Sequence, residues 1–153
     1  MKTIFHFSDT AKSVLLSLGW TEDRVVDIGA VVTNLGRRGY ILHESAAGIL
    51  GSFLGLYITE PVGFSVFFTN PAMIGGLFVQ DQLLELNPEL FVDLYPIGTT
   101  SLSCLFVNPR GVIFSVDCDR YSWYSFRSIE RMMDVVLRID KPTSEEMYKL
   151  LRG

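Results

Sequence analysis

The sequence predicts an α+β fold, because helical and strand-like segments are grouped along the chain rather than alternating. Helical periodicity dominates residues 9–54, strand-like segments lie mainly between residues 63 and 117, and helical periodicity returns after Ser125. A hairpin turn at residues 108–111 (Asn-Pro-Arg-Gly) joins one pair of strands. This order favours a mostly antiparallel (mixed) sheet, with N-terminal helices and a long C-terminal helix packed around it, over a doubly wound parallel fold.

The first helix is expected to begin at Ser8 or Asp9, either of which can cap it. Its apolar positions recur at helical spacing: Ala11, Val14, Leu15 and Leu18. Gly19 stands where a helix terminator is expected, because glycine adopts the left-handed backbone without penalty. Trp20 follows this terminator and is predicted to be substantially buried over the helix end.

Two more helices are expected in the N-terminal third. The second begins after Asp27 and stops at the Gly-Arg-Arg-Gly segment of residues 36–39. The third is opened by His43 or Ser45 and ends near Gly55.

Strand-like segments follow at residues 63–69, 94–98, 102–107 and 112–117. The last two are predicted to pair antiparallel around the hairpin turn. Between the first two, residues 77–86 have helical period, and Asn87 can cap a further turn that begins at Pro88.

The C-terminal part is predicted to be helical. Ser125 caps a long helix that continues to Leu137 and packs on the sheet. The aromatic residues at 121–126 are interpreted as the hinge between the last strand and this helix, or alternatively as interface anchors. Thr143 or Ser144 begins a short terminal helix.

Length and composition indicate a single domain, residues 1–153. Thirteen Lys and Arg against seventeen Asp and Glu give a net charge of −4, which disfavours a free-standing nucleic-acid-binding protein. The N-terminus has no apolar run typical of a signal peptide, and prolines and glycines interrupt the uncharged stretch 61–80. We therefore expect a cytoplasmic protein with no membrane span. The stretch 61–80 is either buried internally or forms a homodimer contact.

The sequence contains no nucleophile-elbow, phosphate-binding or dinucleotide-binding glycine motif. Its two histidines and two cysteines stand singly, so no local cluster supplies the three or four ligands of a zinc site. His43 is interpreted as a helix cap or surface residue. We therefore expect no enzymatic activity, no cofactor and no metal. The alternative is a small metal-dependent or hydrolytic enzyme that uses Asp117, Asp119 and a distant histidine.

The charge distribution is the most informative feature. Residues 39–109 contain no Lys or Arg and carry a local net charge of −6. The acids in this window are Glu44, Glu60, Asp81, Glu85, Glu89 and Asp93. Four of them recur at steps of four and would form a single anionic ridge on one continuous helix, although Pro88 indicates an interruption into two pieces. The window is either a solvated face or a docking surface for a basic partner.

Residues 19–27 read Gly-Trp-Thr-Glu-Asp-Arg-Val-Val-Asp, which resembles the "GW…R.VD" signature near the start of SUKH-3 domains. Residues 39–47, continuing to Phe53, are similar to the family's following helix. Residues 95–98, a hairpin about Gly111 and a closing helix from Ser125 resemble its C-terminal half. SUKH-3 domains belong to the SUKH superfamily of bacterial immunity proteins, which also includes Syd-like and Smi1/Knr4-like proteins.

The resemblance implies an α+β immunity protein that binds and neutralises a cognate toxin domain, often a nuclease or deaminase, in the producing bacterium. Toxins that act on nucleic acid bring Lys and Arg to phosphates, so the expected partner has a basic surface. The expected partner-binding residues are the regularly spaced acids of the base-free window, Asp81, Glu85, Glu89 and Asp93, with Glu60 as a neighbour. A Smi1/Knr4-like regulatory scaffold is the other non-enzymatic interpretation.

Overall fold

The computed structural model describes residues 3–59, 65–67, 84–85, 87–100, 103–117, 122–143, 146 and 149–150. The helices in these ranges are α1 (Asp9–Ser17), α2 (Gly29–Arg37), α3 (Glu44–Phe53), α5 (Pro88–Phe91) and α6 (Ile129–Val136). The strands are β1 (Tyr57–Thr59), β2 (Ser65–Phe67), β3 (Tyr95–Thr100), β4 (Cys104–Val107), β5 (Ile113–Asp117), β6 (Ser122–Phe126) and β7 (Lys149–Leu150). Within the described residues, no helix is long and apolar enough to cross a membrane.

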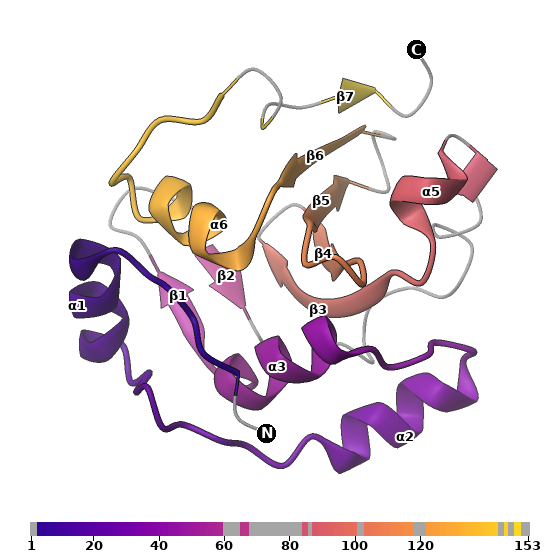
Figure 1. Cartoon of the computed structure of the whole chain (residues 1–153), viewed down its shortest axis with the longest axis horizontal. Helices are drawn as coiled ribbons and strands as arrows, with labels where there is room; N and C mark the ends of the chain where they lie inside the picture. Colours follow the sequence, from indigo (N-terminus) through magenta and orange to yellow (C-terminus); the bar gives the residue numbers. More distant parts are fainter. Residues whose placement is uncertain are drawn as a thin grey trace.

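The strands form one sheet in the order β1 to β7, and each strand pairs antiparallel with the next along the chain. The α+β class and the antiparallel sheet are therefore confirmed. The predicted hairpin is also confirmed, since Cys104 pairs with Val116 and Val107 with Ile113 across the turn. Figure 1 shows α3 lying along β3 and α6 lying along β6, in agreement with their contacts.

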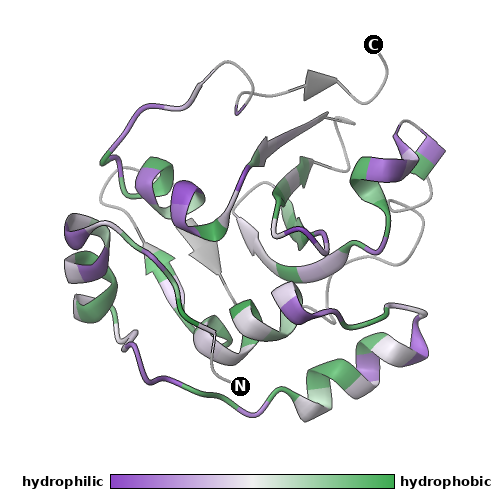
Figure 2. Cartoon of the chain, in the orientation of Figure 1, coloured by the Kyte–Doolittle hydropathy of each residue, from purple (hydrophilic) through white to green (hydrophobic). Residues whose placement is uncertain are grey.

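Side-chain alternation divides the interior between the two faces of the sheet. On β4, Leu105 and Val107 join the larger core, which also contains the buried faces of α1, α3 and α6. Phe106 points the other way, into a smaller core beneath Phe91 of α5. Neighbouring residues serve opposite cores because successive strand side chains point to opposite faces. Polar and apolar residues likewise alternate around α6, as Figure 2 shows.

The predicted N-terminal helices are confirmed, and the caps predicted for α1 and α3 are present. The Ser8 hydroxyl accepts a hydrogen bond of 3.2 Å from the Ala11 amide at the start of α1. Gly19 ends this helix with φ +103°, and Trp20 is only 2% exposed. His43, rather than Ser45, caps α3.

Two predictions for the middle of the chain are only partly within the described residues. Strand β2 lies inside the predicted strand 63–69, and residues 84–85 are helical inside the predicted helix 77–86. The rest of the uncharged stretch 61–80 lies outside the described residues. The short strand β1 was not predicted, because its three residues give too brief an alternation to detect.

The prediction of a long C-terminal helix from Ser125 is wrong. Residues 122–126 pair with β5 over five positions, so Ser125 and the aromatic residues Trp123 and Tyr124 belong to strand β6, not to a hinge. The helix is the eight-residue α6, capped by Ser128, whose hydroxyl accepts from the Arg131 amide at 3.1 Å. Two serines three positions apart both satisfy the capping rule, and strand pairing decides between them.

The predicted terminal helix is also wrong at its end, where residues 149–150 form β7 against β6. The segment leading to β7 is held by a buried ion pair. Arg131 donates from Nε and Nη2 to both carboxylate oxygens of Glu146, each at 2.7 Å, and from Nη1 to Asp140 at 2.6 Å. These hydrogen bonds hold the pKa of Glu146 down, at about 2. A bidentate pair of this kind joins α6 to a segment fifteen residues further along the chain.

Candidate protein-binding surface

The structure places three of the five sequence-predicted site residues. Glu85, Glu89 and Asp93 are all exposed. Glu60 and Asp81 lie outside the described residues.

These acids do not lie on one continuous helix, in agreement with the interruption that Pro88 predicted. Asn87 has an extended backbone (φ −155°, ψ 93°), and its side chain accepts a hydrogen bond from the Leu90 amide at 3.1 Å. Helix α5 begins at Pro88, at the position where the missing N–H costs nothing. The predicted interruption is therefore confirmed, and the four-residue spacing does not produce a helical ridge.

The turn between β4 and β5 fixes the position of α5. Asn108 donates from Nδ2 to the Leu90 carbonyl at 3.1 Å, and Arg110 donates from Nη2 to the Glu89 carbonyl at 3.3 Å. Both donors belong to the hairpin turn, so the exposed carboxylate of Glu89 is presented beside that turn.

Asp93 follows α5 in the chain and lies near His43. Its backbone adopts a left-handed conformation (φ +53°), which aspartate tolerates better than most residues. Burial lowers the pKa of the His43 ring, while the Val107 carbonyl and the backbone and carboxylate of Asp93 act in the opposite direction. The influence of Asp93 on this ring places the acid near the start of α3, fifty positions earlier in the chain.

The start of α3 is attached to the same turn. Ser45 donates from its hydroxyl to the Pro109 carbonyl at 2.9 Å, and the exposed Glu44 precedes it. Glu44, Glu89 and Asp93 therefore surround one hairpin turn, and we call these three residues the acidic surface. With the nearby guanidinium of Arg110, the group carries a net charge of −2. Glu44 was not among the predicted site residues, since its only sequence signal was membership of the base-free window 39–109.

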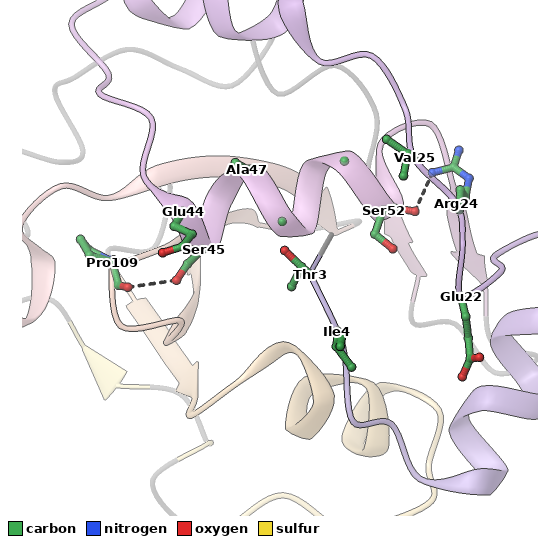
Figure 3. A pocket seen from close by; sticks show the side chains of 12 residues that line it. Thr3, Ile4, Glu22, Arg24, Val25, Glu44, Ser45, Ala47, Ser52 and Pro109 are labelled. Atoms are coloured by element: carbon green, nitrogen blue, oxygen red, sulfur yellow. Dashed lines mark hydrogen bonds between the residues drawn. The ribbon is translucent and has the colours of Figure 1, made fainter. Parts of the chain in front are cut away.

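A surface groove of about 550 Å³ runs along α3 away from this turn. Its lining includes Ala47, Gly48 and Gly51 of α3, together with the apolar side chains of Ile4 and Val25. Figure 3 shows Glu44 and Pro109 at one end of the groove and Arg24 at the other, with the N-terminal segment at Thr3 and Ile4 crossing beside the helix. The acidic surface and the groove thus meet at Glu44.

The residues of the "GW…R.VD" signature hold the far end of this groove. The Trp20 ring stacks on Phe53 at 6.0 Å between ring centroids. Arg24 donates from Nη1 to the Ser52 carbonyl at 2.7 Å and from Nη2 to the Leu54 carbonyl at 2.9 Å. A cation is favourable there, because the last carbonyls of a helix lack intrahelical donors and carry partial negative charge.

The signature also starts the preceding helix. Asp27 accepts at Oδ1 from the Gly29 amide at 2.9 Å, at the first residue of α2. The Val26 amide donates to the Gly51 carbonyl at 2.8 Å. Residues 19–27 therefore stabilise the fold, because they connect the start of α2 to the last turn of α3.

The described residues do not form the metal-binding or hydrolytic site that the enzymatic alternative would require. Asp117 ends β5, and Asp119 lies outside the described part of the chain. His43 accepts at Nδ1 from the Ala46 amide at 3.2 Å, so its proton lies on Nε2, which donates to the Val107 carbonyl at 3.2 Å. Among the residues that the structure describes, no group of three or more His, Cys, Asp or Glu side chains is placed to hold a metal ion.

Comparisons with known protein families, with characterised proteins and with solved structures find no match to this chain.

Proposed function

We propose that this chain is an immunity protein of the SUKH type, which binds a cognate toxin domain with a basic surface and thereby neutralises it. The observation that carries the proposal is the acidic surface. Three carboxylates from the start of α3, from α5 and from the second residue after α5 are presented around one hairpin turn. The resemblance of residues 19–27 to the SUKH-3 signature supports the same function.

The chemistry of the acidic surface matches that of a toxin cleft that binds phosphates. Such a cleft concentrates Lys and Arg, and a protein that offers carboxylates there competes directly with nucleic acid. Complementary potential of this kind accelerates association and selects among partners. The hairpin turn accepts a hydrogen bond from Ser45 of α3 and donates one to the Leu90 carbonyl of α5, so the carboxylates belong to ordered elements, which favours specific recognition.

The test uses the toxin domain encoded in the reading frame next to the gene for this chain. The double charge reversal Glu44→Lys and Glu89→Lys is compared with wild type in toxin binding kinetics and in protection of growth during co-expression. Both sites are exposed, so the variant is expected to fold normally. Its association rate is expected to fall by about tenfold or more at low salt, with the difference shrinking at high salt as exposed charges are screened.

The matched control is Asp9→Lys, which reverses an exposed carboxylate on α1. It is expected to associate and to protect like wild type. The proposal is wrong if wild type does not bind this toxin, or if the double reversal binds and protects as well as the control.

A further inference from the structure

Two of the most exposed large apolar side chains in the described residues line the same groove. Ile4 and Val25 are each 74% exposed, and both contribute to the lining of the groove along α3. Single exposed apolar residues are ordinary on a protein surface. Two of them lining a groove of about 550 Å³ are instead typical of a binding cleft, because the concave shape lets an occupant bury both.

The floor of the groove is hollow at Gly51 and filled at Gly48. A Cβ atom added to Gly51 would meet no atom within 4 Å, whereas one added to Gly48 would collide with the Thr3 side chain. The N-terminal segment therefore closes the groove over Gly48. An occupant that enters over Gly51 reaches the helix backbone without displacing any part of the chain.

The charges along the groove differ between its two ends. At the far end, the Arg24 guanidinium is engaged by two carbonyls, and Glu22 is paired with Lys12. At the near end, Glu44 has no cation partner among the described residues, and it belongs to the acidic surface. An occupant that places a positive charge at the near end gains an ion pair there.

We propose that the groove receives an apolar segment of the toxin that carries a Lys or Arg at the end facing Glu44. This inference rests on the proposed function and extends it, because it assigns the toxin a second contact beyond the acidic surface. The apolar part of the segment covers Ile4 and Val25, and its basic residue continues the charge pairing that the acidic surface begins. Carboxylates at the rim act mainly on association, whereas contacts buried in a groove act mainly on dissociation.

The experiment fills the groove and measures dissociation of the same toxin domain. Gly51→Leu places a side chain in the hollow part of the floor, and helix propensity favours leucine over glycine there. The matched control is Gly36→Leu, on α2, where an added Cβ also meets no atom within 4 Å and the site does not line the groove. Gly51→Leu is expected to speed dissociation by about tenfold or more without altering the salt dependence of association, and Gly36→Leu to leave dissociation unchanged.

A second pair of variants does not touch the helix backbone. Val25→Ser removes an apolar side chain from the lining of the groove and is expected to weaken toxin binding by roughly tenfold. Its control is Ile41→Ser, at a residue that is 71% exposed and does not line the groove. Ile41→Ser is expected to bind as wild type does.

The outcomes separate the two proposals. If the toxin binds wild type, Gly51→Leu and Val25→Ser equally well, the groove inference is overturned while the proposed function stands. If wild type does not bind the toxin, both the proposed function and the groove inference are overturned. If sedimentation shows that wild type self-associates and that Gly51→Leu alone abolishes this, the occupant is a second copy of the chain and the inference is overturned.

Discussion

The indole Nε1 of Trp20 donates a hydrogen bond of 2.8 Å to the hydroxyl of Ser52, and both residues are buried. The bond spans 32 positions of sequence and joins the segment after α1 to the last turn of α3. Arg24 donates to the carbonyls of Ser52 and Leu54 at the same place. These contacts give the two side chains distinct roles in this chain: the Trp20 ring fills a buried position and its N–H is hydrogen-bonded, and Arg24 caps the end of α3.

We expect Ser52→Ala to destabilise the protein by about 1–2 kcal/mol, because it leaves the buried indole N–H without an acceptor. Urea denaturation monitored by tryptophan fluorescence measures the change. Ser17→Ala is the control, since that hydroxyl is exposed and bonds only within α1. Equal stability of the two variants would show that the Trp20–Ser52 bond contributes nothing.

Gly48 and Gly51 offer a matched pair on one helix. Gly51→Ala is expected to stabilise the protein by about 0.5–1 kcal/mol, because alanine is the better helix former and meets no neighbour. Gly48→Ala is expected to lose this gain and to release the N-terminal segment, because its methyl group would collide with Thr3. Amide hydrogen exchange at residues 3–7 measures that release.

The double variant Gly48→Ala with Thr3→Gly tests the cause. It removes the Thr3 side-chain atoms that the added methyl group would meet. We expect it to restore protection of the N-terminal segment. Continued rapid exchange in the double variant would mean that the close approach of Thr3 to α3 is not what Gly48 permits.

The lowered pKa of His43 predicts that the protein loses stability in mildly acidic solution. Burial lowers its pKa below 6.5, so the unfolded chain takes up a proton before the folded chain does. The contribution of this residue to stability is therefore complete above pH 6.5 and is lost as the pH falls from 6.5 towards the lower folded pKa. Protonation also removes the Nδ1 lone pair that caps α3.

His43→Asn retains a side-chain oxygen that can cap the helix and removes the titration. We expect its free energy of unfolding to change less than that of wild type between about pH 7 and about pH 5. Chemical denaturation across this range measures the difference. An unchanged pH profile in His43→Asn would assign the titration to another group.

The contribution of Glu146 to stability changes at a lower pH than that of His43. Its pKa falls from 4.5 to about 2 through the hydrogen bonds from Arg131, so its stabilising effect is present above pH 4.5 and is lost as the pH falls towards 2. We expect Glu146→Gln to destabilise the protein by about 3 kcal/mol at neutral pH, because it leaves a buried guanidinium without its main partner. The variant should also lose less of its remaining stability on acidification.

Asp140→Asn is the comparison for this pair, since Asp140 contacts the same guanidinium but is largely exposed. Its effect on the free energy of unfolding should be clearly smaller, because solvent screens exposed pairs. If the two variants are equally stable, burial does not strengthen the Arg131–Glu146 pair.

Local chemistry in the sequence determined the starts of α1, α3 and α5, the end of α1 and the hairpin. Ser8, His43 and Asn87 cap the helices that follow them, and each accepts from an amide three residues further on. Gly19 and Gly111 adopt positive φ where the chain turns. These features were predictable because the interacting groups lie within a few residues of each other, so no distant part of the chain has to be known.

The tertiary structure alone decided which segments pair and which side chains meet. Residues 122–126 carry serine and aromatic residues that suit a helix start or a strand, and only pairing with β5 makes them β6. Likewise, the four-residue spacing of the acids pointed to a helix face that does not exist, whereas Asp93 acts on His43 and Ser45 bonds the hairpin turn, contacts between segments far apart in the chain. Contacts between distant segments depend on the packing of the whole core, and that packing is not encoded by the residues next to each contact.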